Sequence, residues 1–221
     1  MALLTVERIS KSFGDNVIIN ETSFAVQPGD ATAFVSPSGS GKSTLLSMVG
    51  LLLTPDTGRI LTADGCDALA LPDKELSRLR QRLFGFVFQS AQLIGSLTAL
   101  ENVTAAAGFA GRLDFRPQER GVELLERFGL AKHIHHYPHQ LSVGQKRRVA
   151  VARAMLLQPA VIIADEPTND LDEESAAAVA DALFEYAAAG NALLYATHVP
   201  QLASRAKTVM VMEDHVFMPR A

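Results

Sequence analysis

The chain has 221 residues, which suits one large domain or a core with a subdomain and leaves ample room for a buried core. Its 20 basic and 24 acidic residues give a net charge of −4, so no global field favours nucleic acid or an anionic membrane as partner. The single cysteine, Cys66, excludes an intrachain disulfide and indicates a reducing compartment. The most apolar run, at 45–53, is too short to span a bilayer, and we expect neither a membrane span nor a signal peptide.

The first elements along the chain are predicted to be β-strands. Residues 3–6 and 17–26 are β-like runs, and the turn sequence at 28–30 ends the second of them. A further strand is predicted over 58–64, ending at Gly65 in a hairpin.

The sequence SPSGSGKST at 36–44 has the pattern of a phosphate-binding loop. The apolar run Ala31–Val35 before it predicts a buried strand, and the apolar segment from Lys42 to about residue 53 predicts a helix. Glycines let backbone N–H groups converge on an anion, and the helix N-terminus adds a partial positive charge. Lys42 is expected to reach the β- and γ-phosphates of a nucleotide, and the Ser43 hydroxyl to ligate Mg²⁺.

This loop departs from the usual pattern at one position, because Ser36 stands where the first glycine is expected. Serine is small and the glycines nearest the phosphates remain, so we expect the loop to tolerate it. The alternative interpretation is a Gly-Ser turn with a solvated lysine. The residues of this segment that are expected to bind the nucleotide are Ser36, Ser38, Gly39, Ser40, Gly41, Lys42, Ser43 and Thr44.

The middle of the chain is predicted to be mainly helical. Asp73–Leu83 is expected to form a charged helix that turns its arginines to solvent. Residues 90–158 are helix-like, with one helix over 117–128 that starts at a proline and is capped by Gly129.

Four of the six histidines lie in one stretch, at His133, His135, His136 and His139. A metal or haem site is one interpretation. The spacing matches no standard structural-metal pattern, however, and Pro138 breaks any helix. We therefore expect a solvated loop.

The sequence LSVGQ at 141–145 follows directly, and a helix is predicted over 145–157, ending before Pro159. Taken alone, LSVGQ is typical of a helix cap.

Residues 160–164 are apolar at every position, as in a central parallel strand, and they lead into Asp165 and Glu166. Such a strand end is where open α/β sheets bind ligands, and strand alternation is expected to point the two carboxylates in different directions. Asp165 can then hold the water shell of Mg²⁺ while Glu166 faces an attacking water, as a general base or orienting group. The alternative is a strand followed by a helix cap, because a helix is predicted over 175–189.

Together and in this order, SGSGKST, LSVGQ and ADEPT resemble the ATP-binding cassette (ABC) ATPases over essentially the whole chain. The resemblance implies an α/β fold: a P-loop NTPase with a mainly parallel sheet core, an antiparallel β layer and an inserted helical subdomain. It implies a single ABC ATPase domain over 1–221. Residues 1–90 and 159–221 would form the nucleotide-binding core with its β subdomain, and 91–158 the helical subdomain with the signature motif.

In this family the signature of one subunit closes over the γ-phosphate that is held by the phosphate loop of another. The resemblance therefore assigns nucleotide contacts to Ser142, Gly144 and Gln145. Val143 stands where the family's LSGGQ signature has a glycine.

Further landmarks follow from the same resemblance. Phe13 matches an aromatic ring that stacks on adenine, Gln89 a glutamine that touches Mg²⁺ and water, and His198 a switch histidine that contacts the γ-phosphate. Taken alone, the three have simpler interpretations, as a core aromatic, a polar strand end and a structural histidine. Residues 169–172 resemble a loop that crosses the subunit interface, although Asp172 can instead cap the helix that follows it.

The resemblance implies ATP and Mg²⁺ as cofactors. It implies a second copy of the chain, in an ATP-sandwich dimer, and an integral membrane permease subunit as partners, with no nucleic acid. The expected location is cytoplasmic and peripheral, on the inner face of the cell membrane. The expected catalytic residues are Glu166, His198 and Gln89, and the expected metal ligands are Ser43, Gln89 and Asp165.

Within the family, LTALENV at 97–103 and DEPTNDLD at 165–172 look most like one bacterial group, the ATPases of macrolide efflux, lipoprotein release, haem efflux, antimicrobial-peptide resistance and cell division. This implies efflux or mechanotransmission, with haem as the first expected cargo because of the YPHQLS stretch at 137–142. The alternative is a regulatory ATPase that controls an extracytoplasmic hydrolase without transport. Three other classes fit less well. A DNA-repair ATPase would need a coiled-coil or zinc insertion, and a translation-factor ATPase would carry two cassettes in tandem where this sequence shows one. A small P-loop kinase would lack LSVGQ.

Overall fold

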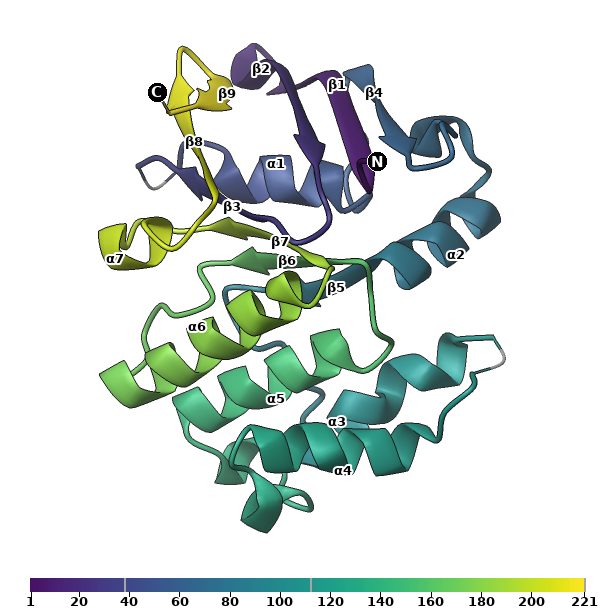
Figure 1. Cartoon of the computed structure of the whole chain (residues 1–221), viewed down its shortest axis with the longest axis vertical. Helices are drawn as coiled ribbons and strands as arrows, with labels where there is room; N and C mark the ends of the chain where they lie inside the picture. Colours follow the sequence, from purple (N-terminus) through teal and green to yellow (C-terminus); the bar gives the residue numbers. More distant parts are fainter. Residues whose placement is uncertain (38, 112, 221) are drawn as a thin grey trace.

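A six-stranded sheet runs through the middle of the molecule, in the order β5-β6-β7-β3-β8-β9 (Figure 1). The computed structural model describes residues 1–37, 39–111 and 113–220. Neighbouring strands of this sheet are parallel except for β9, which pairs antiparallel with β8. The strands are β3 (Ala31–Val35), β5 (Phe84–Val87), β6 (Val161–Asp165), β7 (Ala192–Ala196), β8 (Thr208–Glu213) and β9 (Val216–Pro219).

The most apolar strands lie at the centre of this sheet. β7 is buried at every position, and β3 and β6 are buried at every position except the last. Strands that are covered on both faces read as continuous apolar runs, which is why the sequence predicted them. The prediction of a buried strand before the acidic pair is confirmed, and the strand extends to include Asp165 itself.

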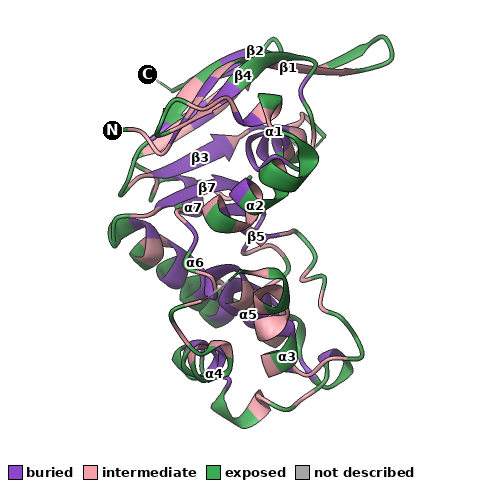
Figure 2. Ribbon diagram, turned by 90° about the vertical axis from the view of Figure 1, so that its right-hand side faces the viewer, coloured by how far each residue is buried: buried purple, intermediate pink, exposed green. Residues whose placement is uncertain are grey.

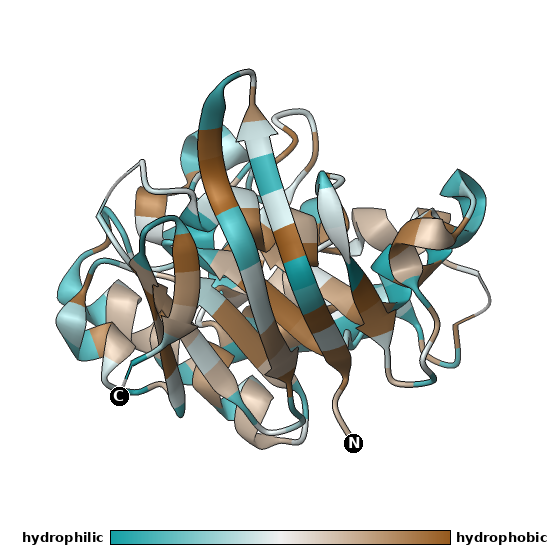
Figure 3. Cartoon of the chain, turned by 90° about the horizontal axis from the view of Figure 1, so that it is seen from above, coloured by the Kyte–Doolittle hydropathy of each residue, from teal (hydrophilic) through white to brown (hydrophobic). Residues whose placement is uncertain are grey.

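A second sheet, of three antiparallel strands in the order β2-β1-β4, packs over the first. Hydrophilic and hydrophobic residues alternate along its long strands (Figure 3), as expected for a sheet with one face on the core. Both long strands extend beyond the predicted runs at 3–6 and 17–26, because Gly14, at φ 58°, allows a tight turn that keeps them paired up to Phe13 and Asn16. The strands are β1 (Leu4–Phe13), β2 (Asn16–Val26) and β4 (Thr57–Thr62).

Helices cover both faces of the central sheet. α1 lies between the two sheets, whereas α5 and α6 cover the opposite face, with α3 and α4 beyond α5 (Figures 1 and 2). Within the described ranges, no helix combines the length and the apolar character that crossing a membrane requires. The helices are α1 (Lys42–Val49), α2 (Asp73–Leu83), α3 (Ala99–Thr104), α4 (Pro117–Arg127), α5 (Val143–Met155), α6 (Glu173–Ala188) and α7 (Pro200–Ala203). Short 3₁₀ turns lie at Ala68–Ala70, Ala105–Phe109, Ala131–His133 and Pro138–Gln140.

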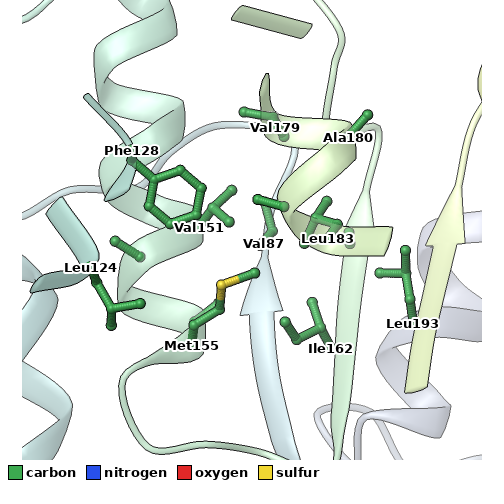
Figure 4. Close-up of a cluster of buried hydrophobic side chains, with 14 of the residues drawn as sticks. Val87, Leu124, Phe128, Val151, Met155, Ile162, Val179, Ala180, Leu183 and Leu193 are labelled. Carbon is green, nitrogen blue, oxygen red and sulfur yellow. The ribbon is translucent and has the colours of Figure 1, made fainter. Parts of the chain in front are cut away.

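Two clusters of buried apolar side chains hold these layers together. One joins the central sheet to α1 and the antiparallel sheet, and includes Phe34 and Ile60. The other joins the sheet to α4, α5 and α6, and includes Val87, Met155 and Leu183 (Figure 4). Burying one such side chain contributes about 1.5–3 kcal/mol, so α5 and α6 are fixed to the sheet by apolar packing.

The end of α1 differs from the predicted one. α1 was predicted to continue to about residue 53 but ends at Val49. Gly50 packs so tightly that a Cβ there would lie 2.6 Å from Cε1 of Phe86, and Leu51 turns away at φ 58°. The helix end is therefore set by packing against β5, which the local sequence does not reveal.

The starts of α5 and α6 are set by side-chain caps. α5 begins two residues earlier than predicted because Ser142 closes its N-terminus. α6 begins at Glu173, and the Asp172 carboxylate accepts a hydrogen bond from the Ser175 backbone N–H at 2.8 Å. The interpretation of Asp172 as a helix cap is thereby confirmed.

Candidate functional site

A cavity of about 330 Å³ opens where β3 and β6 end, the edge at which open α/β sheets bind their ligands. It gathers residues from the two long strands of the antiparallel sheet, the loop before α1, the segment after β5 and the end of β6. The lining residues are Phe13, Ile18, Gly39, Gly41, Lys42, Ser43, Thr44, Gln89, Asp165 and Glu166. All except Ile18 were predicted as site residues, and Ser38 lies outside the described residues.

The loop before α1 is shaped by its last glycine. Gly41 has φ 102°, and a Cβ there would lie 2.8 Å from Cγ2 of Ile18 and 2.9 Å from Cδ1 of Ile19. The position therefore needs glycine both for its backbone angle and for space. Next to it, the buried Lys42 donates from Nζ to the carbonyl of Ser36 at 2.7 Å and to that of Pro37 at 3.0 Å. These bonds hold the ammonium group against the loop.

Ser36 replaces a glycine without filling the cavity. Its side chain is buried, and its hydroxyl is hydrogen-bonded to that of Ser40. Ser36 and Ser40 therefore stabilise the loop from within, and neither is among the described residues that line the cavity.

The site offers hard oxygen donors at one end. The Ser43 hydroxyl and the Asp165 carboxylate line this cavity together and also meet in a smaller neighbouring cavity. Gln89, which is exposed, adds an amide oxygen. Mg²⁺ prefers such oxygen ligands and takes only one or two carboxylates from the protein beside a substrate phosphate. The donor set therefore fits Mg²⁺, although the described residues contain no group of three or more His, Cys, Asp or Glu that could hold a metal.

Glu166 and His198 form a pair across the ends of β6 and β7. Oε2 of Glu166 lies 3.0 Å from Nδ1 of His198, and the Glu166 backbone N–H donates to the carbonyl of Ala196. Glu166 has φ 47°, a backbone angle that is rare for residues other than glycine. Only 11% of its side chain is exposed, against 51% for His198. A carboxylate held in this way at the cavity wall can orient a water molecule and accept its proton.

Phe13 ends β1 at the rim of the cavity. The residue is 55% exposed, so the interpretation as a core aromatic is wrong. Its ring centroid lies 5.6 Å from Nζ of Lys11, which in turn pairs with Asp56 at 2.6 Å. An exposed ring beside a phosphate-binding loop can stack on a planar base.

The LSVGQ segment lies apart from this cavity. Ser142 accepts a hydrogen bond from the Gln145 backbone at 3.2 Å, and the Gln145 side chain accepts one from the Ser142 backbone at 2.9 Å. This capping box closes the N-terminus of α5, so the interpretation as a helix cap is confirmed. Gly144 is buried against Ser175, and Val143 is 59% exposed. Of the predicted nucleotide-binding residues, Ser142, Gly144 and Gln145 are not among the described residues around the cavity.

The four histidines before this segment do not behave alike. His135 and His139 are exposed, as predicted for a solvated loop. His133 is half-buried, its Nε2 lies 3.2 Å from Nε2 of Gln145, and its ring centroid lies 5.0 Å from that of His136. The expectation of a solvated stretch is therefore wrong for His133.

Besides Ile18, a second residue near the site was missed by the sequence reasoning. Arg147, on α5, is 3% exposed, and its guanidinium donates to the carbonyls of Phe88 and Gln89. Burial lowers its pKa, while the carboxylates of Asp170 and Asp165 raise it. The sequence shows only a Lys-Arg-Arg run, and the 3.6-residue helical period was the available signal that Arg147 faces the core.

A larger cavity of about 780 Å³ lies between α2, β5 and α5. The large side chains of Phe109 and Leu52 are exposed in its wall, at 87% and 45%. Its charged lining residues, within the described part of the chain, are all cations: Lys74, Arg78, Arg80 and Arg153. Arg80 is not simply solvated as predicted, because it donates to the carbonyl of Leu51 at 2.8 Å.

Comparison with known proteins is consistent with this geometry. The chain is 39% identical over 213 residues to the lipoprotein-releasing system ATP-binding protein LolD of Bacteroides fragilis, covering 96% of this chain and 98% of that protein. It is 39% identical over 216 residues to the macrolide export ATP-binding/permease protein MacB of Burkholderia pseudomallei, covering 96% of this chain. The chain spans only 33% of the length of MacB.

A solved structure described as a dimeric post-hydrolysis state of the ATP-binding cassette MJ0796 bound to ADP and Pi has a TM-score of 0.88 and 30% identity, over 98% of this chain and 97% of that one. The predicted fold class, a mainly parallel core with an antiparallel β layer and added helices, is confirmed. The model of a family described as ABC transporter matches residues 19–169. The chain therefore belongs to the ABC transporter family and is an ATPase domain of that family.

Proposed function

We propose that the chain hydrolyses ATP and that this hydrolysis drives a membrane subunit. The observation that carries the proposal is the 330 Å³ cavity, in which a phosphate-binding loop meets an acidic strand end. Within that cavity Lys42 supplies the positive charge, Asp165 the metal-binding carboxylate and Glu166 the candidate base. The bound ADP and Pi named for the MJ0796 cassette support the same chemistry.

The proposed nucleotide contacts follow the cavity wall. The exposed Phe13 ring stacks on adenine, which leaves the phosphates beside the N-terminus of α1. Lys42 leaves its carbonyl partners to reach the β- and γ-phosphates. The remaining proposed contacts of the loop are Ser36, Ser38, Gly39, Ser40, Gly41, Ser43 and Thr44.

Ser43, Gln89 and Asp165 are the residues that would hold Mg²⁺. When bound, this ion neutralises negative charge on the β- and γ-phosphate oxygens. Asp165 is suited to the task because it is the last residue of β6, so its position is fixed by the sheet.

Glu166 is the proposed general base and His198 its positioning partner and γ-phosphate contact. The 3.0 Å contact between Nδ1 of His198 and Oε2 of Glu166 fixes one carboxylate oxygen, which leaves the other to accept the proton of the attacking water. His198 is half-exposed, so its ring can also reach a phosphate in the cavity.

A second copy of the chain is proposed to complete the site. Ser142 and Gly144 lie outside the cavity of their own chain, and the N-terminus of α5 beside them is suited to bind an anion. In a dimer, the signature segment of each copy would therefore lie over the nucleotide of the other copy. Gln145 would hold that segment in place through the capping box. The dimeric forms of the MJ0796 cassette support this arrangement.

The membrane partner is proposed to dock on the larger cavity. Its wall combines exposed apolar side chains, such as Phe109, with cations and, among the described residues, no carboxylate. A permease segment with apolar and acidic side chains would fit it. In this proposal 1–90 and 159–221 form the nucleotide-binding core, 91–158 form the helical subdomain that carries motion to the permease, and the chain is peripheral on the cytoplasmic face of the membrane.

The names of the relatives indicate release of lipoproteins or export of macrolides, and we propose efflux or mechanotransmission of this general kind. Haem efflux stays a prediction from the YPHQLS stretch at 137–142. A regulatory ATPase that controls an extracytoplasmic hydrolase would have the same site. Identification of the extracytoplasmic domain of the copurifying membrane subunit separates the two.

Phosphate release from ATP by the purified chain tests the proposed activity. Glu166→Gln is expected to lower turnover by about 10²–10⁴-fold, the usual contribution of a general base, with ATP affinity unchanged. Lys42→Ala is expected to abolish ATP binding in calorimetry. The matched control is Glu174→Gln, an exposed carboxylate on α6, which should keep wild-type turnover. Normal turnover by the Glu166 variant would remove that residue from the role of base.

A further inference from the structure

Arg147 is the most deeply buried charged side chain near the site that has no role in the proposed chemistry. It projects from α5 with 3% of the residue exposed. Its two terminal nitrogens each donate to a backbone carbonyl, one to Phe88 and the other to Gln89. Among the described residues it makes no ion pair with a carboxylate within 4.0 Å, so these carbonyls are its hydrogen-bond partners.

Both carbonyls belong to the segment that carries Gln89 into the nucleotide cavity. β5 ends at Val87, so Phe88 and Gln89 are the first residues beyond the support of the sheet. Gln89 itself is exposed and lines the cavity with Asp165. Without another restraint, an exposed side chain on a strand exit would sample many orientations, at a cost to metal binding.

The guanidinium fork supplies such a restraint. Its planar donors fix two successive carbonyls in one geometry, which a single-point lysine ammonium cannot do. Burial of the charge is costly, as the lowered pKa of Arg147 reflects, so the arrangement is favourable only while both carbonyls are in place. The negative charges of Asp170 and Asp165 offset part of this cost, because they act to raise the pKa of Arg147.

The segment is pinned to the same helix at a second point. Arg153, further along α5, donates to the carbonyl of Gln92 at 2.8 Å and to that of Ala91 at 2.9 Å. Residues 88–92 are therefore bonded to α5, and the N-terminus of that helix carries the signature segment. Of the two arginines, Arg147 is the one that contacts Gln89.

We propose that Arg147 is a positioning residue for ATP hydrolysis, which holds the backbone of Phe88 and Gln89 so that the Gln89 side chain meets the metal and water of the site. The inference rests on the proposed function. Removal of Arg147 should lower turnover and raise the Mg²⁺ concentration needed for half-maximal rate, while ATP affinity, which depends on the loop before α1, changes little.

A double-mutant cycle tests this directly. Arg147→Met and Gln89→Ala are each expected to lower kcat about 10-fold, and the double variant no further than either alone, because residues that act as a unit are not additive. The control is Arg148→Met, which removes the neighbouring arginine of α5 and its 3.1 Å bond to the Phe128 carbonyl, away from the cavity; its kcat should equal that of wild type.

The outcomes are distinct. Additive losses, with the double variant about 100-fold slower, would assign Arg147 a purely structural role and overturn the inference. Wild-type kcat and Mg²⁺ dependence in Arg147→Met would overturn it as well. If that variant does not fold in circular dichroism, Arg147→Lys replaces it, and it should show the same lack of additivity with a smaller loss. A wild-type chain without ATPase activity would instead overturn the proposed function itself.

Discussion

Val143 and Gly144 are neighbours in the chain and lie in opposite environments. Val143 replaces a glycine of the family signature and points outward, 59% exposed, where a larger side chain costs the single chain nothing. Gly144 is buried, and a Cβ there would lie 2.6 Å from Oγ and 3.1 Å from Cβ of Ser175. Of the two signature glycines of the family, this chain therefore keeps the one that its own packing requires, Gly144.

Gly144→Ala is expected to destabilise the protein by about 1–3 kcal/mol, because the added methyl group overpacks the contact between α5 and α6. Urea unfolding measures the change. Gly108→Ala is the control, since a Cβ at Gly108 meets nothing within 4 Å among the described residues. Partial recovery is expected in the double variant Gly144→Ala/Ser175→Ala, which removes the nearest clashing atom. Equal stability of wild type and Gly144→Ala would contradict the close approach.

The identity of most site residues could be predicted from the sequence, because phosphate loops and acidic strand ends have local signatures. Gly41, Lys42 and Glu166 belong to such patterns, and all three line the cavity. Arg147 could not be predicted as a site residue, since its partners are carbonyls 58 and 59 residues away and carry no side-chain signal. Ile18 could not be predicted either, because the pairing of β1 with β2 brings it to the cavity wall.

At the scale of elements, the starts of α5 and α6 were set by local chemistry and the end of α1 by tertiary packing. Asp172 begins α6 and Ser142 begins α5 through caps visible in the sequence. The end of α1 at Val49 depends instead on the contact of Gly50 with Phe86 on β5, so the periodicity of the segment overestimated its length. The buried strands Ala31–Val35 and Ala192–Ala196 were predictable because they are apolar throughout.

The cap of α6 makes part of the stability depend on pH. The hydrogen bond from the Ser175 backbone is the main reason that the pKa of Asp172 lies below its ordinary value of 3.8. A carboxyl group whose pKa is lower in the folded than in the unfolded protein stabilises the fold at any pH above its unfolded-state pKa. That stabilisation is lost as the pH falls through its folded-state pKa. The difference in urea midpoint between wild type and Asp172→Ala should therefore be full at pH 7 and shrink below pH 3.8.

Asp172→Asn is the matched control for this experiment, because asparagine caps helices without a titrating carboxylate. The urea midpoint of Asp172→Asn should stay above that of Asp172→Ala at low pH. A difference between wild type and Asp172→Ala that stays constant as the pH falls to 3 would show that the carboxylate does not stabilise α6 by its charge.

At the scale of the whole molecule, the layers separate the two halves of the proposed site. The cavity lies at the edge of the central sheet, on the side of α1, whereas the signature segment begins α5 on the opposite face of that sheet (Figure 1). Ser142 therefore does not line the cavity of its own chain. This geometry is the reason to propose that two copies close around two nucleotides, each completing the other's site.

The mass of the Glu166→Gln variant in solution, measured by light scattering with ATP and Mg²⁺ and again without them, tests this claim most directly. The account predicts a species of twice 23.7 kDa that forms with ATP, persists because hydrolysis is blocked, and is absent without nucleotide and in Lys42→Ala. A mass that stays at 23.7 kDa, while calorimetry shows ATP bound at saturation, would contradict it.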